Sequence, residues 1–249
     1  MPKSQIANYK TKVETICIGD ISFQICTLAD RDQSPAPESL PSSQINLPTE
    51  AISSAIWSYF GTIWPSGLVL ADAMSQYPIG GKKILEIGSG IALASLVLHQ
   101  RGGNITVSDY NPMVESFLLE NVAINQLPPL KFQQSDWTQA NSQLGKFDLI
   151  IGSDILYERG HPQIIADFID RHISDSGQII IVDPGRDHHR KFYQVMMAQG
   201  YCYSEEKIRD RYPDSSASRG RIMTYSRSFQ TEPCEGGVPE SPANRPNLP

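Results

Sequence analysis

Two acids and two glycines fall where buried strands are expected to end. Glu86 lies in the apolar run 84–87, and Gly88 and Gly90 follow that run directly. Asp109 ends the next expected strand. Glycines let a backbone approach a ligand closely, and a carboxylate in the position of Asp109 is suited to accept hydrogen bonds from ribose hydroxyls. The spacing therefore indicates a nucleoside cofactor, with a merely tight glycine turn as the alternative.

This acid and glycine pattern alone fits both NAD and S-adenosyl-L-methionine (SAM). A further pair, Asp136 and Trp137, ends the third expected strand. At that place an acid can accept a hydrogen bond from an adenine amino group, and an indole can pack against the adenine ring. These two residues have no role in an NAD site, so they favour SAM.

Alternating strands and helices from about residue 82 must position these side chains. Short apolar runs that end in glycine or aspartate alternate with helical segments such as 111–126 and 161–173. Repeated β-α-β units imply a parallel sheet with helices on both faces. The last two expected strands, about 201–209 and 221–228, have no expected helix between them. We therefore predict an α/β, Rossmann-like, seven-stranded and mostly parallel sheet with an antiparallel C-terminal hairpin.

The ends of the chain predict two additions to this sheet. Residues 13–28 contain two alternating runs around a Gly-Asp pair, which is typical of a β-hairpin. Residues 230–249 contain five prolines and few large apolar side chains, which is typical of a disordered tail. We expect three parts: an N-terminal β-hairpin extension with a loop over residues 1–48, a cofactor-binding domain over 49–229, and the tail.

Taken in order, these motifs resemble those of class I SAM-dependent methyltransferases over about residues 55–228. Three stretches are also similar to the seven-β-strand protein lysine methyltransferases, called methyltransferase family sixteen. Residues 152–157 match a D-x-x-Y motif, and residues 64–67 match a W-P-x-S/G segment. Residues 183–186 match the D-P-G-R of the branch that methylates lysines of the electron-transfer flavoprotein β subunit. The resemblance implies a methyltransferase domain over 49–229 whose acceptor is a lysine amine of a protein substrate.

The resemblance also implies a SAM site at the ends of several strands. Glu86 and the two glycines would line the methionine and ribose part, Asp109 would bind the ribose hydroxyls, and Asp136 and Trp137 would flank the adenine. The implied cofactor-binding residues are Trp64, Glu86, Gly88, Gly90, Asp109, Tyr110, Asp136, Trp137 and Ser153. Ala92 departs from the pattern, because many members carry glycine there, and a small residue weakens the match little.

Asp154 and Tyr157 are the catalytic residues that the resemblance implies. A lysine amine has a pKa near 10.4, so its deprotonation at pH 7 costs roughly 4–5 kcal/mol. Asp154 would attract and orient the ammonium, although a carboxylate also favours the charged form. Aromatic walls from Tyr157 and Trp64 would desolvate the amine and act in the opposite direction. The three-residue spacing fits one side of a helical turn. The alternatives are that Asp154 caps a turn and that both aromatics only pack.

The other polar residues near these motifs are interpreted as structural. Arg186 is expected to stabilise the loop after the fifth strand. His188 and His189 are adjacent, so their side chains do not share a helical face. With His161 and His172 they are interpreted as a solvated surface, and no metal site is expected.

Composition narrows the partners and the location. The 249-residue chain has a formal net charge of -6, and an acidic chain does not attract nucleic acid non-specifically, which disfavours a DNA or RNA substrate. The N-terminus has no apolar core of a signal peptide, and the longest apolar runs are too short to span a bilayer. We expect a cytoplasmic monomer that acts on a protein and binds neither nucleic acid nor a membrane.

Three other functions remain open from the sequence. The same fold methylates small amines and thiols, since fold does not fix the substrate. A non-catalytic SAM-binding protein is less consistent with a retained acceptor motif. An NAD-dependent oxidoreductase would give no role to Trp137 or to Tyr157.

Overall fold

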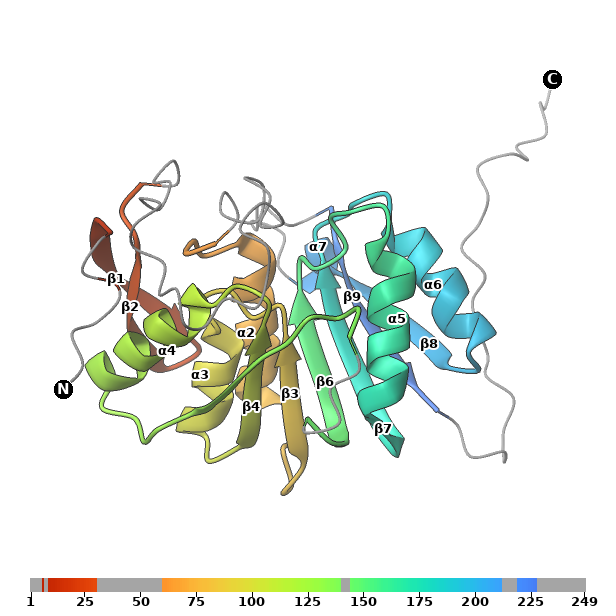
Figure 1. The fold of residues 1–249 in the computed structure, drawn as a ribbon, viewed down its shortest axis with the longest axis horizontal. Coiled ribbons are helices and arrows are strands. Elements are labelled where there is room, and N and C mark those ends of the chain that lie inside the picture. Colours follow the sequence, from red (N-terminus) through yellow and green to blue (C-terminus); the bar gives the residue numbers. More distant parts are fainter. Residues whose placement is uncertain (1–5, 7–8, 31–59, 140–143, 212–218, 228–249) are drawn as a thin grey trace.

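The structure, a computed structural model, describes residues 6, 9–30, 60–139, 144–211 and 219–227. Most of the loop predicted within residues 1–48 and the whole tail predicted over 230–249 lie outside the described residues. These residues form two sheets: a two-stranded hairpin near the N-terminus and a seven-stranded central sheet (Figure 1).

The central sheet has the spatial strand order β5-β4-β3-β6-β7-β9-β8. Its strands are β3 (Lys83–Ile87), β4 (Asn104–Asp109), β5 (Lys131–Gln134), β6 (Phe147–Ser153), β7 (Ile173–Asp183), β8 (Cys202–Lys207) and β9 (Arg221–Ser226). The pairs among β3 to β7 are parallel, and β9 runs antiparallel to both β7 and β8. The predicted fold class is confirmed, with β9 inserted between β7 and β8.

Helices cover both faces of the sheet (Figure 1). They are α2 (Pro65–Gln76), α3 (Leu93–Gln100), α4 (Met113–Ile124), α5 (His161–His172), α6 (His189–Ala198) and the short α7 (Ile208–Arg211). Buried side chains of α2, α3 and α4 share one apolar core, and those of α5 and α6 share another. Within the described part of the chain, none of the helices is long and apolar enough to cross a bilayer.

The alternation of side chains along β3 shows why both faces are covered. Ile84 belongs to the core under α2 and α3, whereas Leu85 and Ile87 belong to the core under α5 and α6. Successive residues of a strand point to opposite faces, so an unbroken apolar run fits a strand that is buried on both sides. Glu86 is the exception in this run, and it is only 3% exposed.

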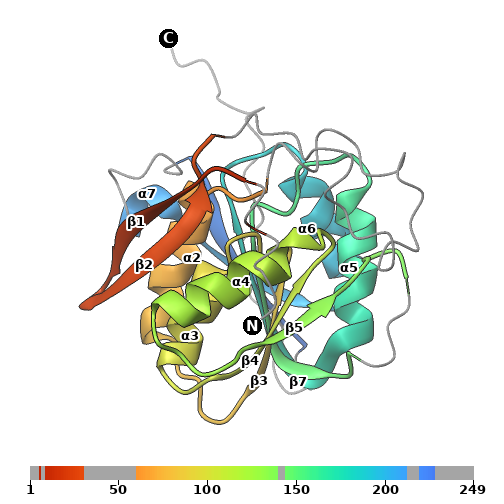
Figure 2. The ribbon, with the colours of Figure 1, turned by 60° about the vertical axis from the view of Figure 1, so that its left-hand side comes forward.

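The N-terminal hairpin consists of β1 (Thr11–Ile18) and β2 (Ile21–Leu28), and it lies alongside α4 (Figure 2). Two asparagines one helical turn apart hold it there. The Asn121 side chain accepts a hydrogen bond from the Cys26 N–H at 2.7 Å and donates to the Cys26 carbonyl at 3.3 Å. The Asn125 side chain makes the same two bonds with Gln24, at 2.8 and 2.7 Å. The edge of β2 is therefore satisfied by amide side chains instead of another strand.

Candidate active site

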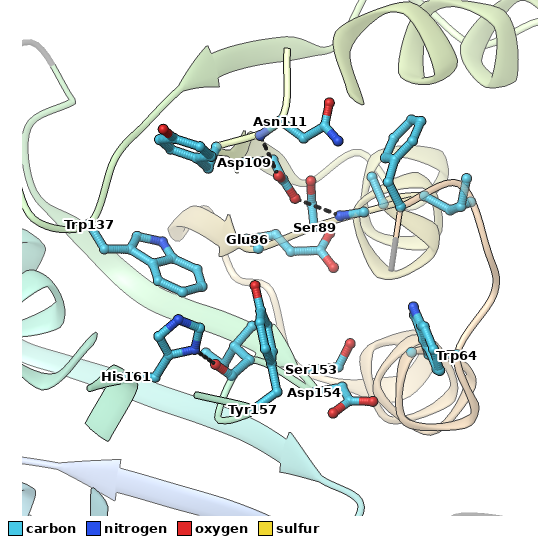
Figure 3. Close-up of a pocket in the computed structure, with 18 of the residues that line it drawn as sticks. Trp64, Glu86, Ser89, Asp109, Asn111, Trp137, Ser153, Asp154, Tyr157 and His161 are labelled. Atoms are coloured by element: carbon cyan, nitrogen blue, oxygen red, sulfur yellow. Dashed lines mark hydrogen bonds between the residues drawn. The ribbon is translucent and has the colours of Figure 1, made fainter. Parts of the chain in front are cut away.

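A cavity of about 410 Å³ opens at the carboxyl ends of the parallel strands (Figure 3). Open α/β sheets place their ligands at this edge. All eleven residues that the sequence predicts for the site line it: Trp64, Glu86, Gly88, Gly90, Asp109, Tyr110, Asp136, Trp137, Ser153, Asp154 and Tyr157. The structure therefore brings the predicted set together in one space, while the role of each residue stays a prediction.

The turn after β3 depends on glycine at two positions. Gly88 and Gly90 have φ angles of +59° and +53°, in the left-handed region that side chains disfavour. A Cβ on Gly88 would lie 2.7 Å from Cγ2 of Ile155 and 3.1 Å from Cζ2 of Trp137. A Cβ on Gly90 would meet nothing within 4 Å. Gly88 thus permits close packing behind the site, whereas Gly90 leaves the cavity side open.

Asp109 joins this turn to the end of β4. Its Oδ2 accepts a hydrogen bond from the Gly90 N–H at 2.9 Å, and its Oδ1 accepts one from the Asn111 N–H at 2.9 Å. Burial raises the pKa of the Asp109 carboxyl, against these hydrogen bonds, which lower it. Two carboxylate oxygens offer about four acceptor positions, so both oxygens can still accept from a ligand.

Glu86 is the most buried acid of the cavity. Its Oε2 accepts hydrogen bonds from both the backbone N–H, at 3.0 Å, and the hydroxyl of Ser95 in α3. Burial raises the pKa of Glu86 to about 7, and the bonds from Ser95 act in the opposite direction. A buried carboxylate at the floor of the cavity can receive a cationic group of a ligand.

Asp136 and Trp137 follow β5 in a tight turn. The Oδ1 of Asp136 accepts hydrogen bonds from the backbone N–H and the hydroxyl of Thr138, at 2.8 and 2.7 Å. These bonds fix the carboxylate beside the indole. The Nε1 of Trp137 is buried and has no hydrogen-bond partner within the described residues. This nitrogen is shielded from the open cavity, so the indole offers its ring and not its N–H to a ligand.

His161 lines the cavity, although the sequence analysis interpreted it as part of a solvated surface. It is 9% exposed, its Nδ1 lies 2.8 Å from the carbonyl oxygen of Ile155, and its ring packs edge-on against Trp137 and Tyr157. His172 is also buried, with Nδ1 at 2.9 Å from the carbonyl oxygen of Gly145. The surface interpretation is wrong for both. The helical spacing of apolar residues along α5 was the available signal, because both rings fall on its apolar face.

Metal binding finds no support from these histidines. Among the described residues, no group of three or more His, Cys, Asp or Glu side chains could hold a metal ion. Burial lowers the pKa of both His161 and His172, so each favours the neutral ring.

Asp154 lies directly after β6 and is paired with Arg186. The Nε of Arg186 donates to Oδ1 of Asp154 at 2.6 Å, and the Asp154 side chain is only 10% exposed. Asp154 has φ +55°, a conformation that costs a non-glycine residue roughly 1–2 kcal/mol. The alternative that Asp154 caps a turn is wrong for its side chain, because the bonded partner is a guanidinium. Arg186 therefore bonds outside its own loop, to the residue that the sequence predicts to orient the acceptor amine.

The expected helical turn between Asp154 and Tyr157 is absent from the described structure. Residues 155–157 are irregular, and α5 begins only at His161. The two side chains still reach the same cavity, because the strained backbone at Asp154 redirects the chain after β6. The Tyr157 ring packs on His161 with centroids 4.5 Å apart, and its hydroxyl points into the cavity (Figure 3).

The N-terminus of α2 closes the other side of the cavity. Trp64 precedes Pro65, the first residue of this helix, and Figure 3 shows its indole across the cavity from Tyr157. A Cβ on Gly67 would lie 3.7 Å from Oγ of Ser153, so the first turn of α2 rests on the end of β6. The cavity therefore has aromatic side chains on facing walls.

The residues present fit SAM. A cavity of about 410 Å³ falls within the range of small-molecule and cofactor sites. Its lining offers the Trp137 indole beside Asp136, the partly buried Asp109 at the end of β4, and the buried Glu86 at the floor. These are the chemical groups needed for an adenine, a ribose and a charged amino acid.

Comparison with known proteins gives a consistent result. A family model described as lysine methyltransferase matches residues 49–199. The electron transfer flavoprotein beta subunit lysine methyltransferase of Xenopus laevis is 26% identical, over 51% of this chain and 53% of the relative. Protein N-lysine methyltransferase METTL21A of Danio rerio is 28% identical, over 62% of this chain and 72% of the relative. The chain spans about half the length of the first of these relatives.

A solved structure supports the fold independently. The T. thermophilus 16S rRNA N2 G1207 methyltransferase has a TM-score of 0.59 with 14% identity, covering 88% of this chain and 51% of that chain. At this identity the likeness concerns the Rossmann-like fold alone.

Proposed function

This chain belongs to the lysine methyltransferase family, and from that premise we propose that it transfers a methyl group from SAM to a lysine amine of a protein. The observation that carries the proposal is the position of Asp154. It places a carboxylate between two aromatic walls, at the edge of the cavity that fits the cofactor. An acid in this position suits a cationic acceptor.

Each predicted cofactor residue lines the cavity, and this shared position supports the proposed roles. Asp109 would bind the ribose hydroxyls from the end of β4, and Glu86 would face the methionine and ribose part. Asp136 and Trp137 would flank the adenine, and the turn at Gly88 and Gly90 would lie against the sugar. Tyr110, Ser153 and Trp64 would complete the walls of the same cavity.

The chemistry of methyl transfer gives different roles to Asp154 and to the two aromatic residues near the acceptor. When bound, SAM supplies a sulfonium methyl group: the amine lone pair forms the N–C bond, the C–S bond breaks with its electron pair on sulfur, and a methylammonium and a neutral thioether result. Asp154 would orient the incoming amine. Tyr157 and Trp64 would exclude water and hold the amine in line with the methyl group, which is the main source of rate in such a displacement.

The nature of the acceptor follows from the family and its relatives. We take the electron-transfer flavoprotein β subunit as the first protein to test, because several relatives are named for it. We further propose that the protein acts in the cytoplasm as a monomer, without nucleic acid or membrane. The net charge of -6 supports the exclusion of nucleic acid.

Incubation with methyl-labelled SAM tests the proposal. The purified protein is mixed with a cell extract and, separately, with recombinant electron-transfer flavoprotein β subunit, and the products are separated by size. Label that co-migrates with a protein and maps to lysine by mass spectrometry is the expected result. Label only in small molecules would favour a small-molecule N- or S-methyltransferase, and SAM binding without any transfer would favour a non-catalytic protein.

A further inference from the structure

The Asp154–Arg186 ion pair lies where two hollows meet. Both residues line the cofactor cavity and also a second hollow of about 340 Å³. Trp64 and Pro65 form one wall of this second hollow, and Pro184 belongs to the other. A side chain entering from the second hollow would therefore pass the ion pair before it reached the cofactor.

The loop that carries Arg186 is held in place by a buried acid. The Oδ1 of Asp183 accepts the backbone N–H groups of Gly185 and Arg186 at 2.8 and 2.9 Å. Gly185 has φ +97°, and a Cβ there would lie 2.9 Å from the carbonyl oxygen of Arg219. The loop after β7 is thus built to present the Arg186 guanidinium at one position.

A lone carboxylate beside an acceptor lysine would be a disadvantage for methyl transfer. It would hold the amine as an ammonium, which has no lone pair, and an opposite charge at this range shifts a pKa by about 1–3 units. A guanidinium bound to the same carboxylate offsets much of that negative charge. The Oδ2 of Asp154 accepts no hydrogen bond from the described residues, so it is still available to the amine.

From this geometry we infer that Arg186 is a positioning residue that sets the protonation state of the acceptor. By neutralising Asp154, it lets the carboxylate orient the amine without locking it in the charged form. The inference rests on the proposed function. The proton leaves the amine for solvent before transfer, and the methyl group then passes to the neutral nitrogen.

None of the other charged groups described around the Asp154–Arg186 pair is a permanent cation bonded to Asp154. On the side of β7, the buried Asp183 interacts electrostatically with Asp154 and with His189. On the side of α5, His161 faces Glu158, which is exposed, and His188. Arg186 is the one permanent cation that bonds to Asp154 within the described residues.

The pH dependence of transfer tests the inference. Single-turnover methylation of recombinant electron-transfer flavoprotein β subunit, or of the protein labelled in the extract, is measured at saturating SAM and acceptor from pH 6 to 10. This rate reports the pKa of the bound amine. In Arg186→Gln the profile should move to higher pH by about one unit, so the rate should fall about tenfold near neutral pH and recover at high pH. Arg186→Lys, which keeps the charge, should stay close to wild type.

A matched control variant and two further measurements separate an effect of Arg186 on the protonation of the acceptor from a loss of structure. Arg209→Gln removes the same charge from an exposed residue that lines neither hollow, and its profile should not move. Melting temperature and S-adenosylhomocysteine affinity verify that each variant is folded, and Arg186→Met replaces Arg186→Gln if that variant is not. An unshifted profile in a folded, active Arg186 variant would overturn the inference alone. A wild-type protein that methylates no lysine at any pH would overturn the proposed function as well.

Discussion

The backbone N–H of Gly90 donates a hydrogen bond to Oδ2 of Asp109 at 2.9 Å. This contact joins the turn after β3 to the end of β4, the two strands at the centre of the cofactor cavity. The glycine turn and the predicted ribose acid therefore form one unit, and a change in either should affect both binding and folding.

Asp109→Ala should weaken S-adenosylhomocysteine binding by about 1.5–3 kcal/mol, because bonds to a charged acceptor are lost. It should also lower the free energy of unfolding by about 1–3 kcal/mol, since the N–H groups of Gly90 and Asn111 lose their acceptor. Calorimetry and thermal unfolding measure the two effects. Asp148→Ala is the matched control: it removes an acceptor of the Lys83 N–H at the other end of β3. It should cost stability only, and equal binding losses in both variants would refute the assignment of Asp109.

Gly88→Ala should destabilise the protein by about 2–4 kcal/mol. The added methyl group meets Ile155 at 2.7 Å and Trp137 at 3.1 Å, and the backbone has φ +59°. Because the clash displaces the indole, cofactor affinity should fall too. Gly102→Ala has an even larger positive φ of +79° but open space around its Cβ. It should show the backbone cost of roughly 1–2 kcal/mol and unchanged affinity. Similar losses of affinity in the two variants would argue against a packing role for Gly88.

The pH dependence of stability should report Glu86. Its pKa rises from 4.5 to about 7 on folding, so the folded state binds more protons in that interval. The free energy of unfolding should therefore contain a contribution that is lost as the pH rises through this interval. Glu86→Gln should remove that contribution, amounting to up to about 3 kcal/mol between wild type and variant across the interval. Chemical denaturation at several pH values measures the difference, and parallel curves for the two proteins would contradict the prediction.

Much of the fold could be predicted because its signals are local. The apolar runs of β3, β6 and β7 are strands buried on both faces, and a glycine or an acid marks where each ends. The insertion of β9 between β7 and β8 could not be read from the chain order. Adjacent strands in sequence form the hairpin, but only the packing of β9 against β7 decides which of them lies at the edge.

The candidate site could be predicted to the same extent. Residues directly after strands converge because parallel strands share an edge, and this brought Asp109, Asp136 and Asp154 together. The ion pair from Arg186 to Asp154 joins residues 32 positions apart through two irregular loops, so no periodic pattern reveals it. The spacing along α5 places His161 on the buried face of the helix, but its ring partners Trp137 and Tyr157 belong to two separate loops, so the spacing does not reveal its place in the site.

His161→Ala should affect both halves of the cavity. The ring contacts Trp137 on the cofactor side and Tyr157 on the acceptor side, and it bonds to the carbonyl of Ile155. We expect a stability loss of about 1–3 kcal/mol together with weaker cofactor binding and slower transfer. His172→Ala removes a ring with a comparable carbonyl bond outside the cavity, so it should lower only the melting temperature. If both variants lose stability alone, His161 is a core residue without a role in the site.

Asp154 and Tyr157 should control transfer instead of cofactor binding. Asp154 lines the cavity with its Oδ1 on Arg186, and the Tyr157 hydroxyl points into the cavity (Figure 3). A positioned group that is lost or displaced by about 1 Å can cost roughly a hundredfold in rate. Asp154→Ala and Tyr157→Phe should therefore slow single-turnover methylation strongly, while S-adenosylhomocysteine affinity stays near the wild-type value.

The same variants separate a role of Asp154 and Tyr157 in methyl transfer from a purely structural role. Asp154→Ala also removes an ion pair whose arginine is 37% exposed, so a stability loss of about 1 kcal/mol is expected beside the kinetic effect. Tyr157→Phe keeps the ring that packs on His161, so its melting temperature should hardly change. If Asp154 had only a structural role, its loss would lower stability and leave the rate at saturating acceptor intact. Normal rates in both folded variants would remove the main reason for placing an amine acceptor here, because no other carboxylate lines both hollows among the described residues.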